Sequence, residues 1–281
     1  MVESTDTGER EFYSACLDCL MTDDPLAKAD KVAQLYDNFD QYLRSASAPP
    51  AVRIETPGIP ARPQLVEPQQ VTRRGFGSAA GRVALLHALA HIEFNAINLA
   101  LDAAYRFRDL PQQVATDFAH DWVRVAADEA RHYKMVARRL ENLGSSYGAH
   151  DAHAGLLNMA LKTDHDVMVR MALVPRVLEA RGLDVAPPMI EKFRKHNDSE
   201  SADILQVIFT DEIEHVRIGN HWFRYTCEQR GLAPSEVFAD LLRQHSKGFL
   251  RGPYNEVARV QAGFSMDELD ALKEIEAEWS D

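Results

Sequence analysis

The sequence lacks several features that define whole classes of protein. It has only three cysteines in 281 residues, which are too few and too odd in number to staple a secreted fold. It has no unbroken apolar run of the roughly 18 residues that a membrane-spanning helix needs. Its first residues, MVESTDTGEREFY, lack the basic leader and apolar segment of a signal peptide. We therefore expect a cytoplasmic protein that does not enter a membrane.

Basic residues are scarce relative to acidic ones. The chain has 31 lysines and arginines against 43 aspartates and glutamates, a formal net charge of -12. This charge repels phosphate backbones, so we expect no broad nucleic-acid binding. A composition with 46% hydrophobic and 26% charged residues is that of an ordinary globular protein, long enough for one large domain or two small ones.

Strand-like patterns are also missing. No stretch of useful length alternates apolar and polar residues, so the sequence predicts an all-α fold. Six prolines interrupt any helical period between Ser45 and Val71, and this segment is predicted to be an extended arm that wraps along a surface. The expected regions are an N-terminal helical appendage over 1–44, the arm over 45–72, a helical bundle over 73–250, and a C-terminal loop and helix packed on the bundle over 251–281.

Four long segments with helical periodicity carry the expected bundle. Proline and glycine punctuation sets their ends. The predicted long helices span about 78–107, 111–143, 164–181 and 199–229. The glycine and prolines of RGLDVAPP are expected to end the third, before a separate short helix at about 188–196. Shorter helices are predicted at 234–246 and 266–279, and one or two within 8–44.

The pattern Asp-Glu-x-x-His occurs twice, as DEARH at 128–132 and DEIEH at 211–215. A glutamate and a histidine three positions apart lie on one helix face about one turn apart, so both can reach the same point. In both helices this face is otherwise apolar. Because burying an unpaired carboxylate or imidazole costs several kcal/mol, these groups need partners, and a metal ion is the simplest common partner.

Each motif follows a helix whose core face contains one further carboxylate. Glu93 precedes the first motif's Glu129 by 36 residues, and Glu179 precedes the second motif's Glu212 by 33. Two such hairpins packed antiparallel bring together four carboxylates and two imidazoles, the ligand set of di-iron and di-manganese bundles. Oxygen and nitrogen ligands favour iron or manganese over a structural zinc. The predicted metal ligands are Glu93, Glu129, His132, Glu179, Glu212 and His215.

The leading aspartate of each motif has a candidate role beside the metal. A metal-bound imidazole usually donates its second N–H to a carboxylate or carbonyl. We interpret Asp128 and Asp211 as such acceptors, each serving the histidine of the other helix, although a solvated helix face would place them equally well. Pro175, one turn before Glu179, is predicted to kink or widen its helix.

Other candidates have plainer interpretations. His87 and His91 are four apart and could bind a metal, but a packing or hydrogen-bonding role is favoured. The CLDC of 16–19 has redox or zinc spacing without a second ligand pair, so core packing is predicted. HDAH at 150–153 is interpreted as a surface turn. Structural pairing is expected for Arg176, Arg181 and Arg217, and core packing for Tyr105, Tyr133, Trp122 and Trp222.

Several blocks resemble a known family. LLHALAHIEFNAINLALDAAYRF, DEARHYKMVARRLENLGSSYG, RMALVPRVLEARGLDVAPP and DEIEHVRIGNHWF are similar to the bacterial family called domain of unknown function 455, within the ferritin-like di-iron carboxylate superfamily. The resemblance covers about residues 55–265. It implies a ferritin-like four-helix bundle with the same six ligands, and it brings no assigned substrate.

Two adjacent ferrous ions held by carboxylates can bind and reduce O2. We therefore expect an O2-dependent oxidoreductase that oxidises or hydroxylates a small or nucleoside-like substrate, with electrons from a reductase partner. The expected cofactor is two metal ions, most readily iron, with manganese or a mixed pair as alternatives. Two other functions stay open: an iron-handling ferroxidase or storage protein, and a non-catalytic metal-stabilised scaffold. A homo-oligomer is compatible with all three, and no catalytic residue is assigned beyond the metal ligands.

Overall fold

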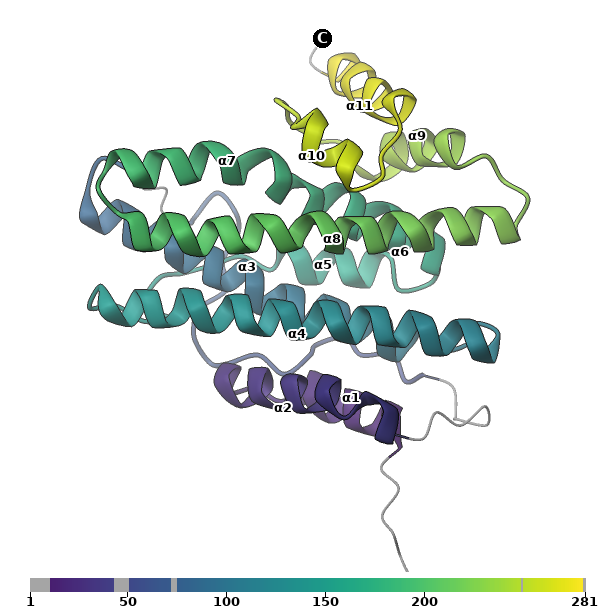
Figure 1. Cartoon of the computed structure of the whole chain (residues 1–281), viewed down its shortest axis with the longest axis horizontal. Helices are drawn as coiled ribbons and strands as arrows, with labels where there is room; N and C mark the ends of the chain where they lie inside the picture. Colours follow the sequence, from purple (N-terminus) through teal and green to yellow (C-terminus); the bar gives the residue numbers. More distant parts are fainter. Residues whose placement is uncertain (1–10, 43–50, 72–74, 249, 280–281) are drawn as a thin grey trace, which may run out of the picture. The chain divides into compact units, whose positions relative to one another are not determined.

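Two short helices joined by an Asp-Pro turn come first among the described residues. The computed structural model describes residues 11–42, 51–71, 75–248 and 250–279. Helix α1 (Phe12–Met21) and helix α2 (Pro25–Asp37) pack against each other (Figure 1). Asp24 caps α2 by accepting a hydrogen bond from the Ala27 N–H, and Pro25 takes the first helical position, where its missing N–H costs nothing. The two helices lie within the predicted 8–44.

The chain forms two compact units, which we describe separately. The first unit comprises residues 1–61 and 93–134, and the second comprises 62–92 and 135–281. Parts of two long helices, α3 (Ala79–Arg106) and α4 (Gln112–Asn142), contribute to the first unit. Their bounds agree with the predicted 78–107 and 111–143 to within a residue.

The proline-rich arm is tied to the first unit at Gly58. The Gly58 N–H donates to the Leu20 carbonyl at 2.9 Å, and the Lys28 ammonium donates to the Gly58 carbonyl at 2.8 Å and to the Asn98 side-chain oxygen. A Cβ at Gly58 would lie 2.3 Å from the Met21 carbonyl oxygen, so only glycine allows this approach. The described part of the arm, 51–71, contains no helix, and its role as an extended arm stays a prediction, while 45–50 and residue 72 lie outside the described residues.

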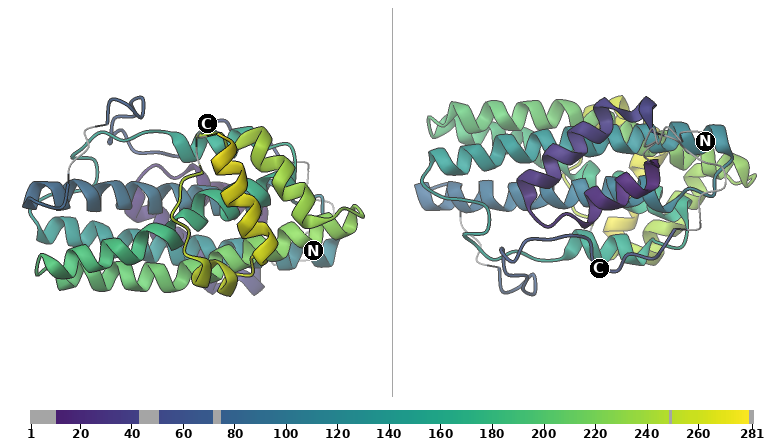
Figure 2. Two further views of the ribbon diagram at one scale, coloured as in Figure 1. Left: turned by 90° about the horizontal axis from the view of Figure 1, so that it is seen from above. Right: turned by 90° about the horizontal axis from the view of Figure 1, so that it is seen from below.

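The second unit is built around helix α8. Besides the remaining parts of α3 and α4, its elements are α5 (Gly155–Lys162), α6 (Val167–Leu173), the π-helical turn η2 (Val174–Glu179), α7 (Ala180–Lys195), α8 (Ser199–Gln229), α9 (Pro234–His245), α10 (Glu256–Gln261) and α11 (Met266–Glu278). Helices α7 and α8 lie side by side, as do α9 and α11 (Figures 1 and 2). The described residues contain no strand, and an isolated bridge pairs Leu65 with Ala152. The all-α prediction is confirmed.

One predicted helix boundary is wrong. The third long helix does not stop after Arg181, and residues 188–196 are not a separate helix, because α7 continues through Pro187 and Pro188 to Lys195. Pro187 has no N–H to donate to the Leu183 carbonyl four residues earlier. The Asn255 side chain donates to that carbonyl instead, at 3.1 Å. A contact from a distant segment therefore satisfies the carbonyl that the proline leaves without its helical donor. Two short helices, α5 and α10, were not predicted.

Helix α3 is long and apolar enough to cross a membrane by composition alone, and it is the one such helix among the described residues. However, 67% of its most apolar window is buried inside the protein, as in the core helix of a globular fold. The three cysteines are free and buried. Burial raises the pKa of the Cys16 thiol and raises that of Cys19 to about 11. The core-packing interpretation of CLDC is confirmed.

Candidate metal centre

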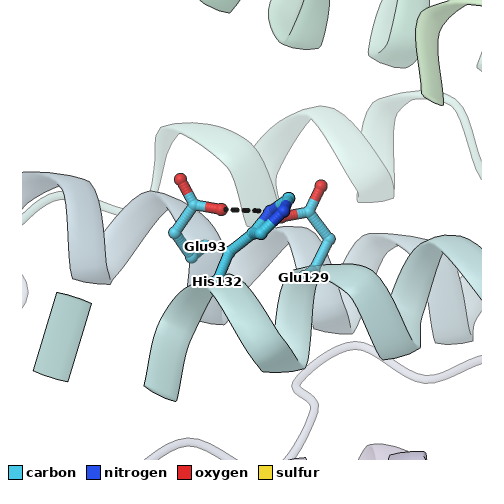
Figure 3. Close-up of side chains that lie close together, drawn as sticks. All are labelled: Glu93, Glu129 and His132. Carbon is cyan, nitrogen blue, oxygen red and sulfur yellow. Dashed lines mark ion pairs between the residues drawn. The ribbon is translucent and has the colours of Figure 1, made fainter. Parts of the chain in front are cut away.

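Three predicted ligands meet inside the first unit (Figure 3). Glu93 comes from α3, whereas Glu129 and His132 come from successive turns of α4. His132 Nδ1 lies 3.3 Å from Glu93 Oε2 and 3.4 Å from Glu129 Oε2. The exposed fractions of the three side chains are 2%, 0% and 0%. One ligand atom from each residue falls within 4.8 Å of the others, so a single ion could contact all three.

The helix period explains why these side chains converge. Glu129 and His132 are three residues apart in α4, so they share one face, and the same face buries Trp122, Val125 and Val136, as predicted. Beside the cluster, the rings of Phe94 and Tyr133 contact each other with centroids 5.8 Å apart. This contact joins α3 to α4 immediately next to the candidate ligands.

The surroundings of this cluster disfavour ionised carboxylates that no cation neutralises. Burial raises the pKa of Glu93 well above its ordinary value, the neighbouring Glu129 charge raises it further, and His132 acts in the opposite direction. Two buried carboxylates and an imidazole therefore favour a bound cation, whether a proton or a metal. Two oxygens and one nitrogen suit iron, manganese or zinc, and contain no thiolate that would mark a structural zinc. The residues fit a metal ion.

The second set of predicted ligands lies in the second unit. Glu179, Glu212 and His215 are all buried. His215 Nδ1 lies 3.7 Å from Glu212 Oε2 within α8. Glu179 is the last residue of the π-helical turn η2, and η2 packs on α8. Pro175, near the start of this turn, lacks the N–H of a regular helical bond, so its predicted widening of the helix is confirmed.

Two close approaches fix how η2 and α7 run past α8. A Cβ built at Gly219 would lie 2.3 Å from the Pro175 Cβ, and one built at Gly182 would lie 4.0 Å from the Glu212 Cγ. From Pro175 to Gly182 the chain runs seven residues forward through η2 and α7, whereas from Gly219 to Glu212 it runs seven residues back along α8. The two segments are therefore antiparallel. Glu179 falls between the two approaches, level with the turn of α8 that carries the motif histidine. That Glu179 meets Glu212 and His215 at one ion, and that both sets of ligands share one centre, stay predictions.

The proposed carboxylate acceptors beside the histidines also stay predictions. Asp128 accepts a hydrogen bond from Arg131, one turn away on its own helix, at 3.0 Å. Asp211 is partly buried at the edge of the motif face of α8. Neither observation tests the predicted pairing with the histidine of the other motif.

His87 and His91 have the structural role that was favoured. The Gly148 N–H donates to His87 Nε2 at 2.9 Å, while His91 hydrogen-bonds the Tyr147 hydroxyl and the His153 carbonyl at 2.9 and 3.0 Å. Burial lowers the pKa of His87 to about 4, consistent with a neutral ring that accepts. The HDAH segment, predicted to be a surface turn, thus contacts the histidines of α3.

Two buried cations went unrecognised as core residues. Lys28 is fully buried, although lysine is the residue least expected in a core. Arg176 is fully buried too: it pairs with Glu268 at 2.5 Å, and its guanidinium lies 3.7 Å from the Phe238 ring centroid. The structural-pairing interpretation of Arg176 is confirmed. Their partners are far away in the sequence, so local pattern offered no signal for either contact.

Together the fold and the site define an all-α protein with buried glutamate and histidine groups that could hold a metal ion. The chain belongs to the family described as "Protein of unknown function (DUF455)", which matches residues 21–270. It is similar to an uncharacterized protein of Haemophilus influenzae, with 43% identity over 273 residues and 95% of each chain covered. No solved structure gave a significant match.

Proposed function

We propose that this protein is a ferritin-like di-metal carboxylate enzyme that uses O2 to oxidise or hydroxylate a small or nucleoside-like substrate. The observation that carries the proposal is the buried cluster of Glu93, Glu129 and His132, in which His132 Nδ1 lies within 3.4 Å of a carboxylate oxygen of each glutamate. A protein gains nothing in stability from adjacent buried carboxylates unless a cation neutralises them.

Repetition supports a second metal ion. The second motif repeats the same Glu-x-x-His spacing on a core face of α8, and Glu179 again comes from the preceding helical segment. Six ligands of this composition match the di-metal set of ferritin-like bundles. The proposed centre therefore pairs the two triads around two ions, with iron first and manganese or a mixed pair next.

The side chains have distinct proposed tasks. Bound iron would supply electrons and open coordination positions for O2. Glu129 and Glu212 would hold both ions, His132 and His215 would each bind one, and Glu93 and Glu179 would complete the two ends. Their burial keeps bulk water away from the centre. A reductase donor and a small-molecule substrate in the cytosol are the proposed partners, and the three buried free thiols fit that reducing compartment.

The test is anaerobic loading with two equivalents of Fe(II), followed by exposure to O2. We expect O2 uptake coupled to Fe(II) oxidation, with the iron remaining bound to the chain. Glu129→Gln should abolish the uptake, whereas Glu141→Gln, an exposed change on the same helix, should not. Binding without O2 uptake would instead indicate a metal-stabilised scaffold. Release of ferric iron or assembly into a large shell would indicate iron handling.

A further inference from the structure

A very close approach between α8 and η2 in the second unit lies beside the second set of proposed ligands. Gly219 of α8 and Pro175 of η2 are so close that an added Cβ on the glycine would lie 2.3 Å from the proline Cβ and 2.4 Å from its Cγ. Both residues are buried. Gly219 follows the ligand His215 by four residues and Pro175 precedes the ligand Glu179 by four. The approach is thus about one helical turn from both ligands.

The proline ring cannot move aside as a flexible side chain could. Its Cβ and Cγ belong to a ring closed onto the backbone, and that backbone forms the π-helical turn that ends at Glu179. A methyl group at position 219 would therefore push the whole turn away from α8. Well-packed interiors transmit such a shift because they hold few voids to absorb it.

We propose that Gly219 is a positioning residue for the metal centre: its missing side chain lets η2 approach α8 closely enough for Glu179 to share an ion with Glu212 and His215. This inference rests on the proposed function. It adds that binding of the second metal ion requires the close approach that Gly219 permits. Gly219 does not contact the ion itself. It acts through Pro175 and the turn that carries Glu179.

Gly182 offers a matched control on the same pair of helical segments. A Cβ built there would lie 4.0 Å from the Glu212 Cγ, an ordinary van der Waals separation. Both Gly219→Ala and Gly182→Ala replace a helical glycine by the best helix former. The two variants therefore share the change in helix propensity and differ in the steric conflict.

The experiment begins with full-length protein from which a chelator has removed the metal. The protein is titrated with Co(II), whose d–d absorption reports its coordination, and the bound metal is counted after gel filtration. The wild type should bind two ions. Gly219→Ala should keep the ion of the Glu93 triad but bind the second roughly 10–100-fold more weakly, with an altered d–d spectrum. Gly182→Ala should bind both ions as the wild type does. If Gly219→Ala bound two ions with wild-type affinity and spectrum, this inference would be overturned, whereas the proposed function would not.

A rescue variant separates positioning from general damage. Pro175→Gly removes the ring that the new methyl group meets, whereas Pro175→Ala keeps the Cβ at 2.3 Å. Adding Pro175→Gly to Gly219→Ala should restore the second ion, and adding Pro175→Ala should not. Equal failure of both double variants, with Pro175→Gly alone binding two ions, would contradict the proposed contact. A wild type that binds no Co(II) would instead refute the proposed function, and this inference with it.

Discussion

Replacing Glu93 by glutamine should stabilise the metal-free protein and remove the part of its response to metal that comes from the Glu93 site. Glutamine has nearly the same shape, so the packing between α3 and α4 is retained. It removes one of two adjacent buried carboxylates, and its amide can donate a hydrogen bond to Glu129. This single substitution should therefore raise the free energy of unfolding of the metal-free protein and lower the stabilisation that metal provides.

The sign for the metal-free protein follows from the raised pKa of Glu93, which is caused first by burial and then by Glu129. Above the ordinary value of 4.5 the unfolded chain has lost this proton while the folded protein still holds it. The free energy of unfolding therefore falls as pH rises through this window, by up to about 1.4 kcal/mol per pH unit for one proton. Glutamine removes this slope, and we expect a gain of roughly 1–3 kcal/mol at neutral pH.

Urea unfolding of chelator-treated protein between about pH 5 and 8, followed by circular dichroism, measures these quantities. The wild type in Mn(II) at about 100 times the dissociation constant should gain about 2.7 kcal/mol per bound ion. Glu93→Gln should lose the gain that comes from its own site. Glu141→Gln, an exposed substitution in α4, should change neither value.

The reasoning would be refuted if Glu93→Gln destabilised the metal-free protein at neutral pH, or if it left the Mn(II) response intact. The first result would show that the Glu93 charge is well compensated by protein groups alone. The second would show that the ion binds elsewhere.

Two further predictions concern contacts outside the candidate ligands. Gly58→Ala should lower the free energy of unfolding by about 1–3 kcal/mol, because its Cβ meets the Met21 carbonyl oxygen. The control is Gly77→Ala, whose Cβ meets nothing within 4 Å. Equal urea midpoints for the two variants would contradict the tight contact at Gly58. The neutral form of His87, whose pKa burial lowers to about 4, accepts from the Gly148 N–H. Between about pH 4 and 6.5 the unfolded chain binds more protons, so stability should rise with pH there, and His87→Gln should flatten the urea midpoint profile; an unchanged profile would argue against it.

Periodicity predicted the long helices well because their signals are local. Helix α8 begins at Ser199 and ends at Gln229, as predicted, since Asp198 caps its first turn and Gly231 follows its last residues. The break expected after Arg181 failed for a non-local reason. Asn255, far along the chain, donates to a carbonyl that a proline leaves without its usual partner, and no local pattern contains that contact.

The candidate site was predictable to the extent that helix spacing determines it. Glu129 and His132 share a face by period alone, and Glu93 was placed on the facing stripe by its apolar neighbours. The close approach of Gly219 to Pro175 was not predictable, because it depends on which residues of two segments meet. A glycine on a helix stripe can equally mark a bend, a cap or a contact.

The most direct test of the central claim is the number of metal ions per chain in protein purified without chelators, measured by elemental analysis together with protein concentration. We expect two ions of iron or manganese per chain in the wild type, and at most one when His132 is replaced by alanine. A folded wild-type chain that contains no metal and takes up none when Fe(II) or Mn(II) is supplied would contradict it.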